Sequence, residues 1–364
     1  MRHVIRRSLA ALVLVSVSVL AASARADTAF PAGAWDIVDP GSLGWDAARL
    51  DSARRFAEAI GSSAVMIVWD GKVLAEWGDT REPFPIHSMR KSLMSALLGI
   101  AVAKGRLELD TTLGQLGIDD STPSLTEDEK QARIRDLIMA RSGVYHEAAY
   151  ETRTMRERRP ARGSHPPGTF WYYNNWDFNV LATILQDATG IDFYEALQRW
   201  IAEPVGMQDY TLRDGDWIYA PSSIYPAYTL RMSARDLARF GLLYLNRGQW
   251  QGRQVVPARW VGQSIQPYSP VSPGLGYGYL WWVASGDRQF DVRLGPGSYS
   301  ARGHGGQVLV VIPSRRLVIV HLCQAESGRA SVSKKHFHML LAKILEARPD
   351  QATVAASPKS MPLD

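Results

Sequence analysis

A serine and a lysine stand three residues apart at the start of an apolar segment, His87–Val102 (HSMRKSLMSALLGIAV). From Leu93 to Ala103 the residues are apolar or small on every side, so we expect a central, buried helix. A lysine buried there is costly unless it is paired or loses its proton. Residues three apart share a helix face, so Ser88 Oγ and Lys91 Nζ are expected to meet.

A neutral amine beside a hydroxyl can take its proton, and this pairing therefore predicts a nucleophilic serine with lysine as its base. The alternative is structural, with Ser88 as a helix N-cap and Lys91 reaching out to water. The spacing is not specific by itself, because Ser331-Val332-Ser333-Lys334 matches it equally well at the start of the last predicted helix. We interpret that second copy as helix capping.

Two later segments add to the first copy. Pro167–Asn175 (PGTFWYYNN) precedes a predicted helix, and Gly303–Val310 (GHGGQVLV) leads into a predicted strand. In this order the three segments resemble the motif set of the serine β-lactamase and penicillin-binding-protein superfamily. The resemblance covers roughly residues 35 to 346. It is nearest to the class C-like branch, which includes carboxylesterases, D-amino-acid peptidases and 6-aminohexanoate-dimer hydrolases.

The resemblance implies roles for the middle segment. Tyr-x-Asn occurs in two registers there, and the spacing from Pro167-Gly168 selects Tyr173 and Asn175. Tyr173 would share proton transfer with Lys91, and Asn175 would help to hold Lys91 and the substrate amide. A phenol between cations can have a lowered pKa and act as a base. We interpret Tyr172 as a packing residue.

The resemblance also assigns the last segment to substrate binding. The backbone N–H groups of Ser88 and Gln307 would form an oxyanion hole, while His304, Gly305 and Gly306 would line the substrate. β-Lactamases and D,D-peptidases of the superfamily usually carry lysine where His304 stands, and that cation helps to bind the substrate's carboxylate. Its absence favours an ester or another amide over a β-lactam or peptidoglycan substrate.

The expected function is an exported serine hydrolase that cleaves a small ester or amide through an acyl-enzyme. The alternatives are a D,D-peptidase or weak β-lactamase and, in another class, a catalytically silent binding protein on the same fold. The eight histidines show no metal-ligand spacing, so no metal or other cofactor is expected. Arg153–Arg162, a loop rich in arginine, could receive an anionic substrate, although a solvated surface loop is the commoner explanation.

The N-terminus has the pattern of a signal peptide. An apolar run, Leu9–Leu20, follows three arginines and precedes Ala24-Arg25-Ala26, so we expect cleavage after residue 26 and a periplasmic or secreted protein. The run is short for a membrane anchor, and no later segment is long enough to span a bilayer. Four of the 41 basic residues lie in this segment; the 37 that remain face 36 acidic ones, so charge gives no case for nucleic acid.

The order of apolar patterns predicts an α+β fold, in which terminal helices flank one antiparallel sheet and a mostly helical lobe, about 106–265, is inserted. We expect one domain over 27–348 and a loose tail over 349–364. The single cysteine, Cys323, is expected to be buried in a strand. The predicted strands are 64–69, 72–77, 277–283, 307–312 and 317–323. The predicted helices are the central one, which begins with Ser88 and ends at Gly105, and 45–60, 127–140, 176–189, 193–201, 233–245 and 331–347.

Overall fold

The computed structural model describes residues 28–121, 123–325 and 331–348. The predicted signal peptide, 1–26, and the predicted tail, 349–364, lie outside the described residues. Within the described ranges, no helix is both long and apolar enough to cross a membrane.

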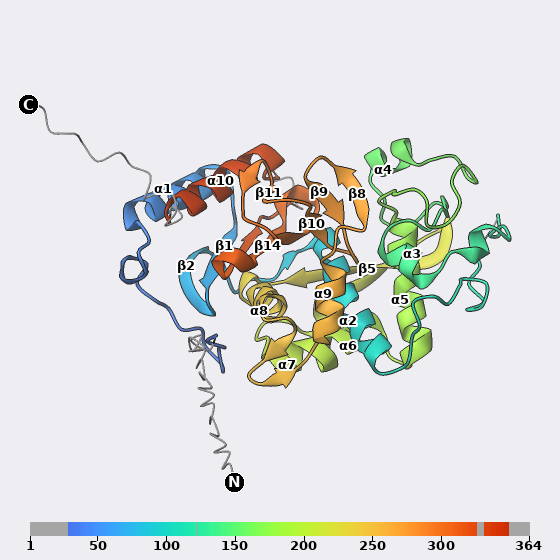
Figure 1. Cartoon of the computed structure of the whole chain (residues 1–364), viewed down its shortest axis with the longest axis horizontal. Helices are drawn as coiled ribbons and strands as arrows, with labels where there is room; N and C mark the ends of the chain where they lie inside the picture. The colour runs from blue at the N-terminus through green and yellow to red at the C-terminus, as the bar shows by residue number, and fades with distance from the viewer. Residues whose placement is uncertain (1–27, 122, 326–330, 349–364) are drawn as a thin grey trace, which may run out of the picture.

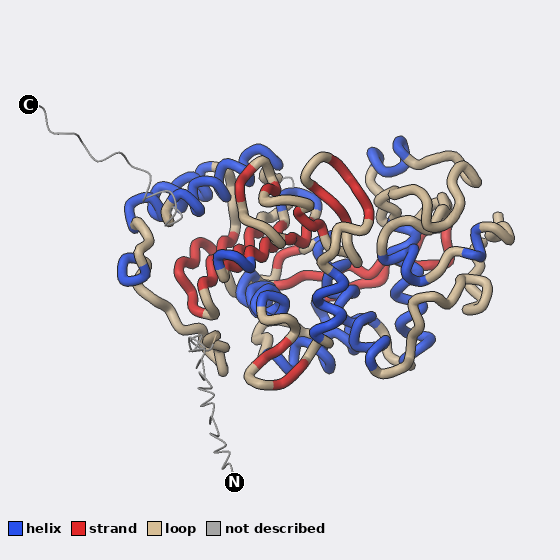
Figure 2. The backbone as a smooth tube through the Cα atoms, viewed as in Figure 1, coloured by secondary structure: helices blue, strands red, loops and turns tan. Residues whose placement is uncertain are grey.

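An eight-stranded antiparallel sheet forms the central layer, and helices lie on both sides of it (Figure 2). The spatial order is β2-β1-β15-β14-β13-β10-β9-β8, so the first hairpin pairs with the last strand of the chain. The strands are β1 (Ala64–Trp69), β2 (Lys72–Gly78), β8 (Ser269–Ser272), β9 (Leu275–Tyr277), β10 (Trp282–Ala284), β13 (Tyr299–Arg302), β14 (Val308–Ile312) and β15 (Leu317–Leu322).

Both faces of this sheet are covered. The terminal helices α1 (Ala47–Ala59) and α10 (Lys334–Glu346) lie together on one face, and α8 (Ala234–Leu245) packs on the other (Figure 1). In β1, Val65 and Ile67 pack with the terminal helices, whereas the alternate residues pack with the core that contains α8. Burial on both faces explains why β1 and β14 are apolar along their whole length and why β15 is apolar at every position except His321.

A second lobe packs beside the sheet around α2 (Arg90–Ala103) and α5 (Asn175–Thr189). Every residue of α2 from Arg90 to Ala101 is buried, as its sequence predicts. The remaining helices are α3 (Ile134–Ile138), α4 (Arg153–Arg158), α6 (Phe193–Leu197), α7 (Glu203–Val205) and α9 (Ala258–Ser264), and the remaining strands are β3 (Phe84–Pro85), β4 (Gly215–Ala220), β5 (Ser223–Met232), β6 (Gln249–Trp250), β7 (Arg253–Gln254), β11 (Arg288–Gln289) and β12 (Val292–Arg293).

The predicted fold class is confirmed, and so is the hairpin of β1 and β2. Two predictions about strands are wrong. The expected strand 277–283 is two strands, because the chain turns between β9 and β10 with Leu280 at φ 62°. The lobe also contains a three-stranded sheet, β3-β5-β4, that we did not predict. Pro226 lies inside β5, and a proline argues against a strand when only the sequence is considered.

The helix ends also differ in places from the prediction. Ser233 caps α8 as expected, since its Oγ accepts from Asp236 N at 3.2 Å. The last helix, however, begins at Lys334 and is capped by Ser333, whose Oγ accepts from His336 N at 3.2 Å. Ser331 is therefore not the cap. The predicted helix 127–140 shortens to α3, because the residue before it, Arg133, is extended.

Candidate active site

Ser88 and Lys91 are in direct contact. Ser88 lies in a 3-10 turn, η2 (His87–Met89), that leads into α2, and Lys91 lies in the first turn of α2. Lys91 Nζ is 2.8 Å from Ser88 Oγ, and the lysine is only 1% exposed. Burial, and secondarily the charge of Arg90, lower the pKa of Lys91 well below its usual range. Both effects favour the neutral amine, which is the form that can accept a proton.

Arg90 brings a second buried cation to the same turn. Its Nη1 donates to the His87 carbonyl at 2.9 Å, and its guanidinium lies over the rings of Tyr228 and Tyr150, at 4.9 and 5.4 Å from their centroids. It is fully buried, and no carboxylate in the described ranges forms an ion pair with it. A positive charge without a counterion disfavours a second positive charge on Lys91.

Tyr173 completes the contact group. Its ring centroid is 5.0 Å from Lys91 Nζ. The ring stacks on Trp282 at a centroid distance of 5.5 Å. The expected lowering of its pKa is wrong: burial raises the pKa of Tyr173 to about 12, against the smaller opposing effects of Ser88 and Arg90. Tyr173 is thus a neutral phenol.

Tyr172 and Asn175, the two other residues singled out in this motif, have different partners, and only Asn175 departs from the expectation. Tyr172 points elsewhere, with its hydroxyl donating to Met155 O at 2.8 Å. Asn175 uses its side-chain Nδ2 to donate to Tyr150 O at 2.7 Å, and its Oδ1 is buried without a partner in the described chain. The predicted hold of Asn175 on Lys91 is not present among the described residues, since the Oδ1 that could accept from Lys91 Nζ has no partner.

His87, which precedes the nucleophile, is a site residue that the sequence did not reveal. Its backbone is left-handed, at φ 47°, a conformation that costs a non-glycine residue about 1–3 kcal/mol. Its Nδ1 is 2.8 Å from the Tyr150 hydroxyl, and its ring meets the His304 ring edge-on at 5.7 Å. Burial lowers the pKa of His87 to about 4. The sequence carries no signal for this strain, which usually selects glycine or asparagine.

The predicted oxyanion segment lies against the turn of the nucleophile. A Cβ on Gly303 would be 2.3 Å from Ile86 O, so the backbones touch there. His304 is exposed, and Gly305 and Gly306 are left-handed, at φ 79° and 104°. Gln307 follows and is fully buried.

The side chain of Gln307 is not available to a substrate. Its Nε2 donates to Cys323 O at 2.6 Å, and its Oε1 accepts from Cys323 N at 3.0 Å. The backbone N–H of Gln307 has no acceptor among the residues that the structure describes. Of the potential donors on this residue, only the main-chain N–H can therefore serve an oxyanion.

A cavity of about 250 Å³ adjoins the turn of the nucleophile. His87 and Tyr150 form part of its wall, and side chains from η5 (Leu212–Asp214), β4 and β5 form the rest. Its lining carries both signs of charge, from Arg213, Asp214, Asp216 and Arg231.

Arg302 and the arginine-rich segment Arg153–Arg162 are two further cation sources, and both have other partners. Arg302 packs between Trp282 and Phe290, and its Nε donates to Ser300 Oγ at 2.9 Å. It lines a separate cavity of about 460 Å³. The arginine-rich loop is largely paired, as with Arg162 and Glu129 at 2.6 Å. This pairing supports the solvated-loop interpretation.

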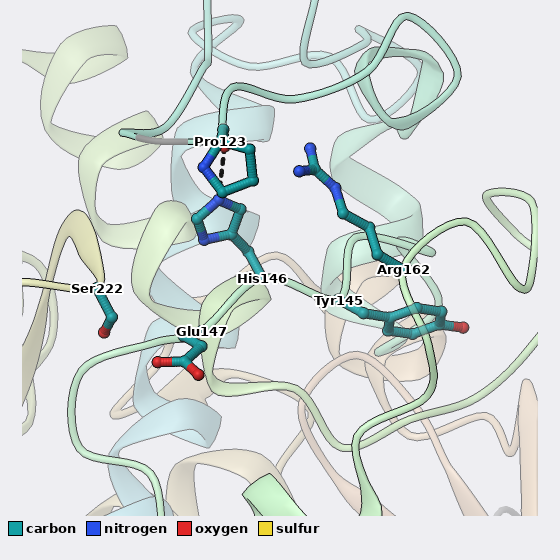
Figure 3. A pocket seen from close by; sticks show the side chains of 6 residues that line it. All are labelled: Pro123, Tyr145, His146, Glu147, Arg162 and Ser222. Carbon is teal, nitrogen blue, oxygen red and sulfur yellow. Dashed lines mark hydrogen bonds between the residues drawn. The ribbon is translucent and has the colours of Figure 1, made fainter.

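A third cavity, of about 300 Å³, contains none of the predicted site residues (Figure 3). Tyr145, His146 and Arg162 are part of its wall, and His146 Nε2 donates to the carbonyl of Pro123 at 2.8 Å. In the described part of the chain, no group of three or more His, Cys, Asp or Glu side chains could hold a metal ion.

The sequence is similar to that of a known protein family and to those of named relatives. The sequence pattern of the family described as "Beta-lactamase" matches residues 47–343. A 6-aminohexanoate-dimer hydrolase from Paenarthrobacter ureafaciens is 26% identical over 335 residues, which cover 82% of this chain and 81% of that protein. A D-aminopeptidase from Gluconobacter oxydans is 28% identical over 165 residues, which cover 40% of this chain and 31% of that protein.

Solved structures agree on the fold. A candidate 6-aminohexanoate-dimer hydrolase from Bacillus anthracis superposes with a TM-score of 0.62 at 20% identity, over 87% of this chain and 86% of that one. A class C beta-lactamase superposes with a TM-score of 0.60 at 14% identity, over 83% and 96% of the two chains.

The charge of Arg90 should set the pH at which Lys91 becomes neutral. A base works only above its pKa, so the rate should rise with pH as Lys91 loses its proton. Arg90→Met removes a repelling charge, raises the pKa of Lys91 and should move this rising limb to higher pH. The measurement is kcat/KM against pH for an ester substrate. Arg90→Lys, which keeps the charge, is the control; a limb that stays in place in Arg90→Met would contradict the assignment.

Proposed function

The chain belongs to the beta-lactamase family, and on that premise we propose that it is a serine hydrolase that cleaves a small ester or amide through an acyl-enzyme on Ser88. The observation that carries the proposal is the 2.8 Å contact between Ser88 Oγ and the buried Nζ of Lys91. A lysine that is neutral and touches a serine hydroxyl is an activating base.

In the acylation step, Lys91 takes the Ser88 hydroxyl proton while Oγ bonds to the substrate's carbonyl carbon. The backbone N–H groups of Ser88 and Gln307 hold the oxygen that becomes negative. The bond to the leaving group then breaks, and the proton on Lys91 passes to the departing alcohol or amine. Tyr173, a neutral phenol, can relay that proton by accepting one at its oxygen and giving its own.

Deacylation runs through the same groups. Water gives a proton to Lys91 and its oxygen bonds to the acyl carbon, so that a second tetrahedral species forms in the same oxyanion hole. When it collapses, the bond to Ser88 Oγ breaks and the serine recovers its proton from Lys91. The product is a carboxylic acid, and the enzyme returns to its starting state.

The substrate class follows from the relatives and from His304. The two curated relatives are named for hydrolysis of an amide and for a peptidase activity, which supports linear amides. His304 is exposed and stands where β-lactam-recognising members carry lysine, so the permanent cation for a substrate carboxylate is missing. Export to the periplasm or the medium is part of the proposal and rests on residues 1–26 alone.

Two alternatives are distinguished by experiment. The likeness in fold to a class C beta-lactamase favours a D,D-peptidase or weak β-lactamase as the second candidate. A catalytically silent binding protein is disfavoured, because Ser88, Lys91 and Tyr173 form one contact group.

A fluorophosphonate probe should label Ser88. Ser88→Ala should abolish both the adduct and turnover, since no other hydroxyl has the neutral lysine beside it. The readout is intact-protein and peptide mass spectrometry together with ester hydrolysis. Ser331→Ala removes the serine of the second Ser-x-x-Lys copy and serves as the control, with wild-type labelling. An adduct on Ser331, or full turnover in Ser88→Ala, would overturn the assignment.

The two adjacent tyrosines provide a matched pair of variants. Tyr173→Phe removes the phenol hydroxyl of the ring beside Lys91 and should lower the acylation rate by a factor on the order of 10². Tyr172→Phe removes only the hydrogen bond to Met155 O and should cost about 1 kcal/mol of stability with little change in rate. Stopped-flow acylation and thermal unfolding separate the two effects. The reverse ranking of the rates would show that the register is wrong.

The histidine at position 304, in place of a lysine, should be reflected in the substrate preference of the protein. A charge-assisted hydrogen bond contributes roughly 1.5–3 kcal/mol, so its loss should weaken selection of carboxylate-bearing β-lactams by about 10- to 100-fold. We expect measurable kcat/KM for p-nitrophenyl acetate or butyrate, and slow or absent turnover of nitrocefin. His304→Lys should improve nitrocefin turnover relative to the esters. If the wild-type chain prefers nitrocefin by tenfold or more, the penicillin-recognising alternative replaces the esterase or amidase.

A further inference from the structure

The N–H of Gln307 belongs to the same peptide group as the carbonyl of Gly306. That group is planar and trans, so its oxygen and its N–H point in opposite directions. The oxygen accepts a hydrogen bond from His321 Nδ1 at 2.7 Å. His321 lies on β15, directly opposite Val308 at the start of β14. The side chain of His321, on the neighbouring strand, thus binds the carbonyl oxygen of the peptide group whose N–H is the proposed oxyanion donor.

The hydrogen bonds fix the tautomer of His321. A carbonyl oxygen can only accept, so Nδ1 carries the hydrogen. Burial lowers the pKa of His321 to about 4, so the ring is neutral and Nε2 is an acceptor. Ser62 Oγ lies 2.8 Å from Nε2 and must donate to it. A directed chain therefore runs from Ser62 through His321 to the Gly306–Gln307 peptide.

Close packing around the hydrogen-bonded residues Ser62, His321 and Gly306 restricts their movement. His321 is fully buried, and its ring packs against Phe337 of α10 at a centroid distance of 5.3 Å. A Cβ on Gly306 would lie 2.7 Å from Val332 O. The preceding carbonyl, that of Gly305, accepts from Cys323 Sγ at 2.7 Å and from Val332 N at 2.9 Å.

We propose that His321 is a positioning residue for the hydrolase, which orients and polarises the Gly306–Gln307 peptide so that the Gln307 N–H becomes a stronger oxyanion donor. This inference rests on the proposed function. A hydrogen bond to a peptide oxygen draws electrons away from its N–H, and chains of such bonds strengthen one another in a buried site. The effect grows with the negative charge on the reacting oxygen, so it acts on the transition state more than on bound substrate.

The test compares His321→Leu, which has no donor, with His321→Asn, whose side-chain Nδ2 can take the place of Nδ1. Removal of a whole oxyanion donor costs 10²–10³ in rate, so weakening one by His321→Leu should lower kcat for acylation on the order of tenfold with KM nearly unchanged. His321→Asn should recover most of this loss. The substrate is a p-nitrophenyl ester with a ¹³C-labelled carbonyl.

The infrared stretch of the acyl-enzyme carbonyl provides a readout that a merely structural role would not move. A weaker oxyanion hole polarises that carbonyl less, so the stretch should shift to higher wavenumber in His321→Leu and return toward the wild-type value in His321→Asn. His146→Leu is the matched control, because His146 is also buried and also donates to a backbone carbonyl, that of Pro123, but outside the proposed site. It should lower stability and leave the stretch unchanged.

The outcomes separate the two proposals. An unshifted stretch with wild-type kcat in His321→Leu overturns the inference, and so does equal impairment of the Leu and Asn variants, which would indicate packing alone. If neither variant folds, Ser62→Ala decides the question. A smaller shift of the carbonyl stretch in the same direction supports the proposed role of the hydrogen bonds from Ser62 through His321, and no shift overturns that role. A wild-type chain that forms no acyl-enzyme removes the proposed function, and this inference with it.

Discussion

Lys91 is almost completely buried, and its amine touches a serine hydroxyl and two aromatic rings but no carboxylate in the described chain. Ionisation there would cost several kcal/mol, and the buried charge of Arg90 increases that cost. The lowered pKa of the amine is therefore a consequence of the burial of α2 in the core. Tyr173 shares the same dry surroundings, which keep its phenol protonated, so burial favours the uncharged forms of both the proposed base and the proposed relay.

The Ser88–Lys91 pair comes from a helix, and the predicted oxyanion donor Gln307 comes from the start of a strand in the sheet. Ser88 and Lys91 stand at the start of the central helix, whereas Gln307 stands at the start of a central strand. Gly303 joins them, because its lack of a side chain lets the strand backbone rest on Ile86. The predicted oxyanion segment is held by His321 of β15 and by Cys323, the residue that follows this strand, so the sheet is a rigid support of the kind that preorganised catalysis requires.

The sequence predicts those parts of the site that depend on local spacing. Ser88 and Lys91 meet because residues three apart share a helix face, and the apolar runs identify β1, β14 and β15. The short strand β13, which lies next to β14 in the sheet, was not predicted. Tyr173's raised pKa was not predictable, because burial depends on residues far away in the chain. The partner of Asn175 and the hydrogen bond of His321 are also long-range. β5 was missed, and Pro226 within it argues against a strand when only the sequence is considered. In the structure Pro226 lies where the register between β4 and β5 is irregular.

The pairing of β1 with β15 joins Ala64 to Leu322, so the centre of the sheet closes only when nearly the whole chain is present. Contacts between residues so far apart are slow to form, because a long loop must close before they stabilise anything. During synthesis on the ribosome, the early hairpin and α2 must wait for the last strands before their apolar surfaces are covered. The central sheet, and with it the approach of Gln307 to Ser88, would thus form late in folding, while the early apolar segments stay exposed.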